Sequence, residues 1–190
     1  MKIRYFIRTT LERKLDKSIY EELGEDYTLL IDYEHKPIDS FIEQLKIISD
    51  YNSILLEDDI ILCKDFKKHI ESVISIYPDI IINFFTSPNM YFKTHIIKGS
   101  FNFNQCTYYP KGISKTIALE MEKLNMNSLG YDVLESHAMF NLNIYHIQYR
   151  PCLVQHIDYK SLLSYKHISS RRSIYFKDYL DELNISYEDA

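Results

Sequence analysis

The chain has 190 residues, of which 46% are hydrophobic and 26% are charged, and it contains only 4 glycines and 5 prolines. These values are ordinary for one folded globular domain, and they exclude a disordered or linker-rich chain. The formal net charge of −5 argues against a protein whose main task is to bind a phosphate backbone. We therefore expect a single domain over residues 1–190.

The cysteines and the N-terminus indicate a protein of the reducing cytoplasm. Cys63, Cys106 and Cys152 are odd in number and widely spaced, which fits neither a disulfide framework nor a zinc site. The apolar stretch at the N-terminus is interrupted by Arg4 and Arg8, so it lacks the centre of a signal peptide. No segment approaches the roughly 18 apolar residues of a membrane span.

The first half of the chain alternates between strand and helix patterns. Runs of β-branched and aromatic residues predict strands, and apolar residues three or four apart predict helices. This alternation predicts an α/β fold with a parallel sheet, in which ligands bind at the carboxyl ends of the strands. In chain order we expect a strand at 2–8, a helix at 11–23, a strand at 27–32, a helix at 38–49, a strand at 53–56, a helix at 66–76 and a strand at 79–85.

The second half is less regular. Residues 90–109 are aromatic and β-prone, and some of their rings are candidates for a sugar-binding platform, although plain burial explains them as well. We then expect helices at 113–124 and 131–141, short strands at 143–149 and 152–156, and a last helix at 172–184.

Three consecutive carboxylates, Glu57, Asp58 and Asp59, follow the buried strand at 53–56. Held together at the end of a sheet they repel one another and are costly to desolvate. A bound Mg²⁺ or Mn²⁺ relieves that cost and bridges the phosphates of a nucleotide. On the spacing alone, a solvated acidic turn explains the triplet equally well.

The residues around the triplet resemble a known family. The segment 54–66, ILLEDDIILCKDF, resembles the LEDD…F signature of GT-A glycosyltransferases, in particular the families that build lipopolysaccharide sugars or branch N-glycans. Residues 151–161, PCLVQHIDYKS, resemble a later segment of these families, and 171–176 resemble the basic segment that follows it. The resemblance implies one GT-A-like, Rossmann-like domain with a mostly parallel central sheet flanked by helices. Residues 1–100 would form the nucleotide-sugar-binding half, and 101–190 the acceptor half and the C-terminal metal and phosphate segment.

The same resemblance implies roles for individual residues. Asp59 and His156 would bind Mn²⁺ or Mg²⁺, and Glu57 and Asp58 would contact the ribose or the sugar. The remaining donor contacts would come from Arg8 and Thr9 at the base and diphosphate, Asp32 at the nucleoside, and Arg171 and Arg172 at the phosphates.

Two acids compete for the role of general base. Asp132 resembles the acidic position near the acceptor in this family, but an acid that follows Gly130 also caps a helix. Glu135 lies one turn further on, and we expect it on a solvated helix face. The sequence departs from the family at two positions. Cys152 stands where Ser is more usual, and Asp158 stands where a Gly often follows the histidine.

We therefore expect a metal-dependent glycosyltransferase that moves a sugar from a nucleoside diphosphate sugar, with UDP favoured, to an acceptor hydroxyl with inversion. The sequence does not identify the acceptor, which could be a polysaccharide, a lipid-linked sugar, a protein or a modified DNA base. The acidic net charge of the chain gives no support to a DNA acceptor. A homo-oligomer is also open. One alternative hypothesis is a metal-dependent nuclease that uses Asp32, Glu34 and Lys36. Another is a non-catalytic GT-A-like binding protein.

Overall fold

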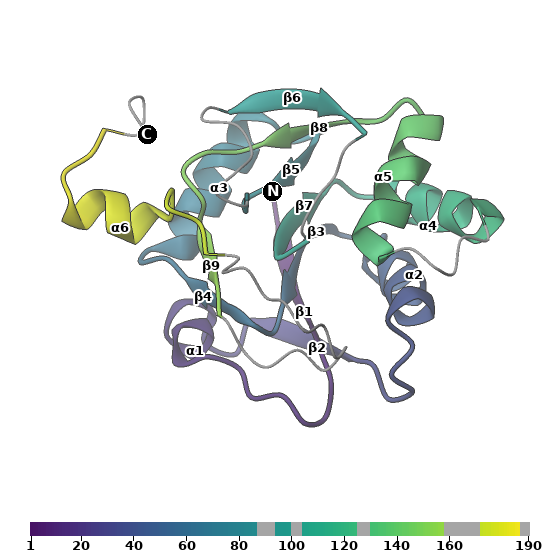
Figure 1. The fold of residues 1–190 in the computed structure, drawn as a ribbon, viewed down its shortest axis with the longest axis horizontal. Helices are drawn as coiled ribbons and strands as arrows, with labels where there is room; N and C mark the ends of the chain where they lie inside the picture. Colours follow the sequence, from purple (N-terminus) through teal and green to yellow (C-terminus); the bar gives the residue numbers. More distant parts are fainter. Residues whose placement is uncertain (87–93, 100–103, 125–129, 158–171, 187–190) are drawn as a thin grey trace.

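The structure is a computed structural model that describes residues 1–86, 94–99, 104–124, 130–157 and 172–186 (Figure 1). Within these ranges, seven strands form a central sheet in the order β2-β1-β3-β7-β5-β8-β6, and two more form a small separate sheet, β4-β9. The strands of the central sheet are β1 (Ile3–Thr9), β2 (Tyr27–Ile31), β3 (Asn52–Glu57), β5 (Ile81–Asn83), β6 (His95–Lys98), β7 (Cys106–Tyr109) and β8 (Tyr145–Gln148).

The central sheet is mixed, with three parallel and three antiparallel pairings, so the expectation of a mostly parallel sheet holds only in part. β1 pairs in parallel with both β2 and β3, and β5 pairs in parallel with β8. β7 lies between β3 and β5 and runs antiparallel to both, and β6 runs antiparallel to β8. The alternating first half therefore does not build one continuous parallel sheet, because a strand from the second half separates β3 from β5.

Helices cover both faces of the sheet (Figure 1). Helices α1 and α3 lie on one face with the small sheet, and α2, α4 and α5 lie on the other. Alternation along each strand divides the core accordingly: Ile54 and Leu56 of β3 face α1 and α3, while Leu55 faces α2 and α5. The helices are α1 (Lys17–Leu23), α2 (Pro37–Ile48), α3 (Phe66–Ile76), α4 (Ile113–Leu124), α5 (Tyr131–Asn141) and α6 (Lys177–Glu182).

Two predicted helices are shorter than expected. The helix predicted at 11–23 begins at Lys17, because the Asp16 side chain accepts the backbone N–H of Ser18 and starts the helix there. Leu11 has helical spacing to the core residues but is 68% exposed. The helix predicted at 172–184 covers only Lys177–Glu182, because Ile174 and Tyr175 form a turn and Phe176 is extended and makes a parallel bridge to Cys152.

The small sheet joins two distant parts of the chain. β4 (Ile60–Leu62) directly follows the acidic triplet, and β9 (Val154–His156) belongs to the segment with the family resemblance. They pair antiparallel, with Ile60 opposite His156. In the described residues no helix is long and apolar enough to cross a membrane.

Candidate functional site

The register of β1 and β3 brings predicted site residues together at the carboxyl ends of the parallel strands. Arg8 lies directly opposite Glu57, and both side chains project toward the face covered by α2 and α5. Thr9 follows at the end of β1, where its carbonyl accepts the backbone N–H of Asp32. Three strand ends therefore meet at one edge of the sheet, where ligands bind in open α/β sheets.

Arg8 and Glu57 form a buried ion pair. Nη1 of Arg8 lies 2.7 Å from Oε1 of Glu57, and the two side chains are only 8% and 14% exposed. Nε of Arg8 donates to Oε1 of Gln44 at 2.6 Å. The guanidinium also lies against the rings of both Phe41 and Tyr131, 4.6 Å and 4.2 Å from their centroids. Arg8 thus faces inward and holds Glu57.

The carboxylates of the triplet are partly desolvated. Burial raises the pKa of Glu57 to about 7; the charge of Arg8 opposes that rise, and Asp59 and Asp58 add to it. Burial also raises the pKa of Asp58, against the effect of Thr9, whose hydroxyl donates to Oδ2 of Asp58 at 2.8 Å. The end of β3 therefore gathers three carboxyl groups where water stabilises their charge poorly, and Arg8 compensates only Glu57 directly. A bound cation would relieve the cost of ionising Asp58 and Asp59 there.

Asp59 and His156 come together through the small sheet. The carbonyl of Asp59 accepts the backbone N–H of Ile157 at 2.7 Å, which continues the β4-β9 pairing. Oδ2 of Asp59 lies 3.4 Å from Nε2 of His156. The Asp59 side chain is 24% exposed and that of His156 is 6% exposed, so the pair reaches solvent through the carboxylate.

This pair fits a divalent cation that takes its other ligands from a bound substrate. Carboxylate oxygen and imidazole nitrogen both suit Mn²⁺, and Mg²⁺ is commonly held by one or two carboxylates plus substrate phosphates and waters. The described residues contain no group of three or more His, Cys, Asp or Glu side chains that could hold a metal. Within the described residues, Asp59 and His156 therefore offer two protein ligands to such a cation.

The structure separates the two acids that compete as general base. Asp132 is half-buried in the first turn of α5, and its Oδ1 accepts the backbone N–H of Val133 at 2.9 Å. Glu135 was expected on a solvated face, but it is fully buried. It accepts from Asn104 Nδ2 at 2.5 Å and from the Tyr109 hydroxyl at 2.8 Å. Glu135 is therefore engaged inside the protein, and Asp132 is the acid at the rim of the helix.

Asp32 adjoins this cluster through the bond from its backbone N–H to the Thr9 carbonyl, but its side chain bonds to its own loop. Oδ1 of Asp32 accepts the backbone N–H groups of Glu34 and Lys36, each at 3.2 Å, so this carboxylate stabilises its own loop. Lys36 and Glu34 pair with each other at 2.6 Å on the exposed surface, an arrangement that does not favour a nuclease site. Arg172 is exposed. Arg171 lies outside the described residues.

Two contributors to the cluster were missed from the sequence. Gln44 shares the buried face of α2 with Phe41, Leu45 and Ile48, and an amide on an apolar helix face was the available signal. Tyr131 donates from its hydroxyl to Oε1 of Glu57 at 2.9 Å. An aromatic residue at the start of a helix carries no sequence signal that distinguishes such a contact from ordinary packing.

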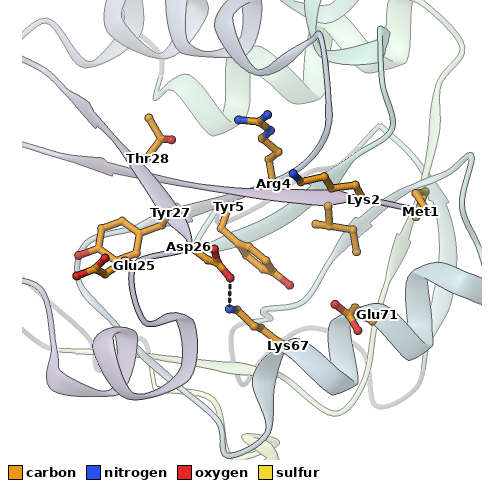
Figure 2. A pocket seen from close by; sticks show the side chains of 11 residues that line it. Met1, Lys2, Arg4, Tyr5, Glu25, Asp26, Tyr27, Thr28, Lys67 and Glu71 are labelled. Atoms are coloured by element: carbon orange, nitrogen blue, oxygen red, sulfur yellow. Dashed lines mark hydrogen bonds and ion pairs between the residues drawn. The ribbon is translucent and has the colours of Figure 1, made fainter.

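A cavity of about 720 Å³ lies at the opposite end of the same strands (Figure 2). It opens beside the starts of β1 and β2 and the first turns of α3. Lys67 and Asp26 pair across it at 2.9 Å. None of the predicted site residues lines this cavity, which is bounded by Met1, Lys2, Ile3, Arg4, Tyr5, Glu25, Asp26, Tyr27, Thr28, Lys67 and Glu71.

Comparisons with known proteins give a fold but no family. No protein-family model and no curated protein matches the chain. Seven chains among the solved structures match it. One is the crystal structure of A197 from STIV, which is 11% identical with a TM-score of 0.51, and the match covers 92% of this chain and 100% of that one. The likeness supports the overall α/β fold alone.

Proposed function

We propose that this chain is a metal-dependent glycosyltransferase that uses a nucleoside diphosphate sugar, with UDP as the favoured nucleotide. The observation that carries the proposal is the meeting of Asp59 with His156 beside the buried carboxylates of Glu57 and Asp58. These residues belong to two segments that are distant in sequence and that separately resemble GT-A glycosyltransferases.

Asp59 and His156 would hold Mn²⁺ or Mg²⁺. When bound, the ion would supply positive charge against the diphosphate leaving group. Thr9 orients Asp58 through the hydrogen bond from its hydroxyl, and Arg8 orients Glu57. Arg8 was expected to contact the donor directly; its buried ion pair favours the role of holding Glu57 in place.

Asp132 is the proposed general base. It stands in the first turn of α5, whose first residue, Tyr131, contacts Glu57. A carboxylate at the rim can accept the proton of an acceptor hydroxyl as that hydroxyl attacks the anomeric carbon. Attack from the side opposite the leaving diphosphate inverts the anomeric centre. Glu135 is less suited to this role because two hydrogen bonds and complete burial keep it from an acceptor.

The test is thermal unfolding with UDP, GDP, CDP and their sugar conjugates, with and without Mn²⁺. A ligand that binds only the folded state stabilises it by about 2.7 kcal/mol at a hundredfold excess over its dissociation constant. We expect a rise in Tm that requires both metal and one nucleotide, and that disappears in Asp59→Ala. Asp26→Ala, at the far cavity, is the matched control and should keep the rise.

The other outcomes separate the rival functions. Metal-dependent nucleotide binding without hydrolysis or transfer of any donor sugar would identify a non-catalytic binding protein. No rise in Tm with any nucleotide would contradict the proposal, and the triplet would then be an acidic turn.

A further inference from the structure

Helix α5 places two polar side chains on its buried face, one turn apart. Tyr131 reaches β3, where its hydroxyl donates to Oε1 of Glu57 at 2.9 Å. Glu135 reaches β7, where it accepts from the Tyr109 hydroxyl at 2.8 Å. The remaining buried residues of this face are Leu134, Ala138 and Met139.

These two contacts differ in kind from the apolar packing around them. Apolar contacts have no preferred direction, so a helix held only by them can slide or rotate at small cost. A buried hydrogen bond is directional, and losing it leaves a desolvated polar group without a partner. Tyr131 and Glu135 bond to two different strands, so together they fix both the height of α5 over the sheet and its rotation about its own axis.

Asp132 depends on that rotation. Successive residues of an α-helix are about 100° apart, so Asp132 lies about 60° around the helix from Glu135, at the edge of the buried face. A rotation of α5 therefore changes the position of the Asp132 carboxylate relative to the acidic triplet, which β3 holds in place. The ring of Tyr131 adds a second constraint, because it packs 4.9 Å from the ring of Phe41 of α2 and covers Arg8.

We propose that Tyr131 and Glu135 are positioning residues that set Asp132 at a fixed place relative to Glu57, Asp58 and Asp59. The proposal rests on the proposed function, because it takes Asp132 as the base. Neither residue is assigned a contact with substrate. They act through the position of α5, and so link the donor end of β3 to the acceptor side of the site.

The first experiment compares Tyr131→Phe with Tyr108→Phe. Both remove one phenol hydroxyl, and Tyr108 donates from its hydroxyl to the carbonyl of Pro78 at 2.7 Å, near the start of β3 and away from the triplet. A misplacement of about 1 Å can cost about a hundredfold in rate. We expect Tyr131→Phe to lower kcat by about tenfold to a hundredfold while KM for the donor changes less than about twofold. Tyr108→Phe should leave kcat unchanged.

Glu135→Gln provides an independent variant. It keeps the shape of the side chain but replaces one acceptor by a donor that faces Asn104 or Tyr109. The same fall in kcat at constant donor KM is expected above about pH 7, where the Glu135 carboxyl has lost its proton and accepts both hydrogen bonds. If both variants transfer sugar at the wild-type kcat, or lose donor affinity in proportion to rate, the positioning role is wrong.

Amide hydrogen exchange separates this proposal from the proposed function. We expect faster exchange in the first turn of α5 in Tyr131→Phe than in wild type or Tyr108→Phe, whatever the activity of the protein. Unchanged exchange would overturn the anchoring role even in an active enzyme. A wild-type chain that neither binds nucleotide with metal nor transfers sugar would instead overturn the proposed function, and with it the role assigned to Asp132.

Discussion

The two ends of strand β1 differ in how far their charged residues are shielded from water. At the carboxyl end, Arg8 is buried and paired with Glu57 under two aromatic rings. At the amino end, the large cavity is bounded by charged residues that meet water, and its pair of Lys67 and Asp26 is 32% and 81% exposed. The cavity therefore holds an ion pair that water reaches, whereas the pair at the carboxyl end is largely shielded from water. Desolvated charge, rather than empty volume, marks the end of the sheet where chemistry is expected.

The strongest contrast between the two ends should appear in activity. His156→Ala removes one of two proposed metal ligands, and we expect metal-dependent sugar transfer to fall by about a thousandfold, since a catalytic ion supplies several kcal/mol to the transition state. Lys67→Ala at the cavity should transfer at the wild-type rate. Steady-state assays over a series of Mn²⁺ concentrations measure both. Full activity in His156→Ala would remove this residue from the site.

Stability should separate the two ion pairs next. Arg8→Met leaves the Glu57 carboxyl buried without its cation, and breaking a buried pair in this way costs about 3 kcal/mol or more. Lys67→Met breaks an exposed pair and should cost less than about 1 kcal/mol. Urea unfolding of the two variants gives the comparison. Equal costs would mean that the pair at the site is solvated like the one at the cavity.

The pH dependence of stability should report the buried carboxyl of Glu135. Burial raises its pKa from 4.5 to about 7, although Asn104 and Tyr109 oppose the rise. The folded state therefore holds this proton at pH values where the unfolded state has lost it. Binding of this proton by Glu135 therefore adds to the free energy of unfolding. The added stability is greatest below about pH 4.5 and falls by at most about 3 kcal/mol as the pH rises toward 7.

Glu135→Gln should remove that part of the decline, and urea unfolding between pH 4.5 and 7 measures it. Glu71→Gln at the cavity is the control and should keep the wild-type slope. An unchanged slope in Glu135→Gln would show that the carboxyl titrates as it does in the unfolded chain.

The smallest change in the chain tests Asp132 without altering it. A Cβ added to Gly130 would lie 2.7 Å from Oδ1 of Asp132, so Gly130→Ala must displace that carboxylate. The backbone of Gly130 is extended with a negative φ, which alanine adopts, and the cost in stability should be below about 1 kcal/mol. We expect a fall in kcat with little change in Tm. Normal kcat in Gly130→Ala would argue against Asp132 as the base.

The sequence predicted local structure better than it predicted pairing. Apolar periodicity placed helices α2, α3 and α4 close to their observed bounds, because each has a clear apolar face to bury. Helix α5 was also placed correctly, although its buried face includes the polar Glu135. The insertion of β7 between β3 and β5 was not predicted, since pairing partners depend on contacts far apart in the chain. The predicted start of the first helix at Leu11 was wrong, because the spacing of apolar residues cannot show whether each of them has a neighbour to pack against.

The same limit applies to the site. The acidic triplet was visible because three carboxylates after a buried strand are costly without a counter-charge. Its neighbour His156 was expected through the family resemblance, and the structure brings the two segments together. Burial of Glu135 was not foreseen, because its partners Asn104 and Tyr109 lie on another element. From sequence alone, a charged residue is predicted to face water unless the buried groups that bind it are known.

The small sheet also has a consequence for the order of assembly. β4 leaves the ribosome early, but its partner β9 follows only after α3, β5 to β7, α4, α5 and β8 have been made. Pairings of such long sequence separation form late, after closer contacts have reduced the loop that must be closed. A nascent chain can therefore complete most of its core before His156 of β9 comes to lie next to Asp59. The proposed metal pair would thus arise as one of the last steps in the maturation of the protein.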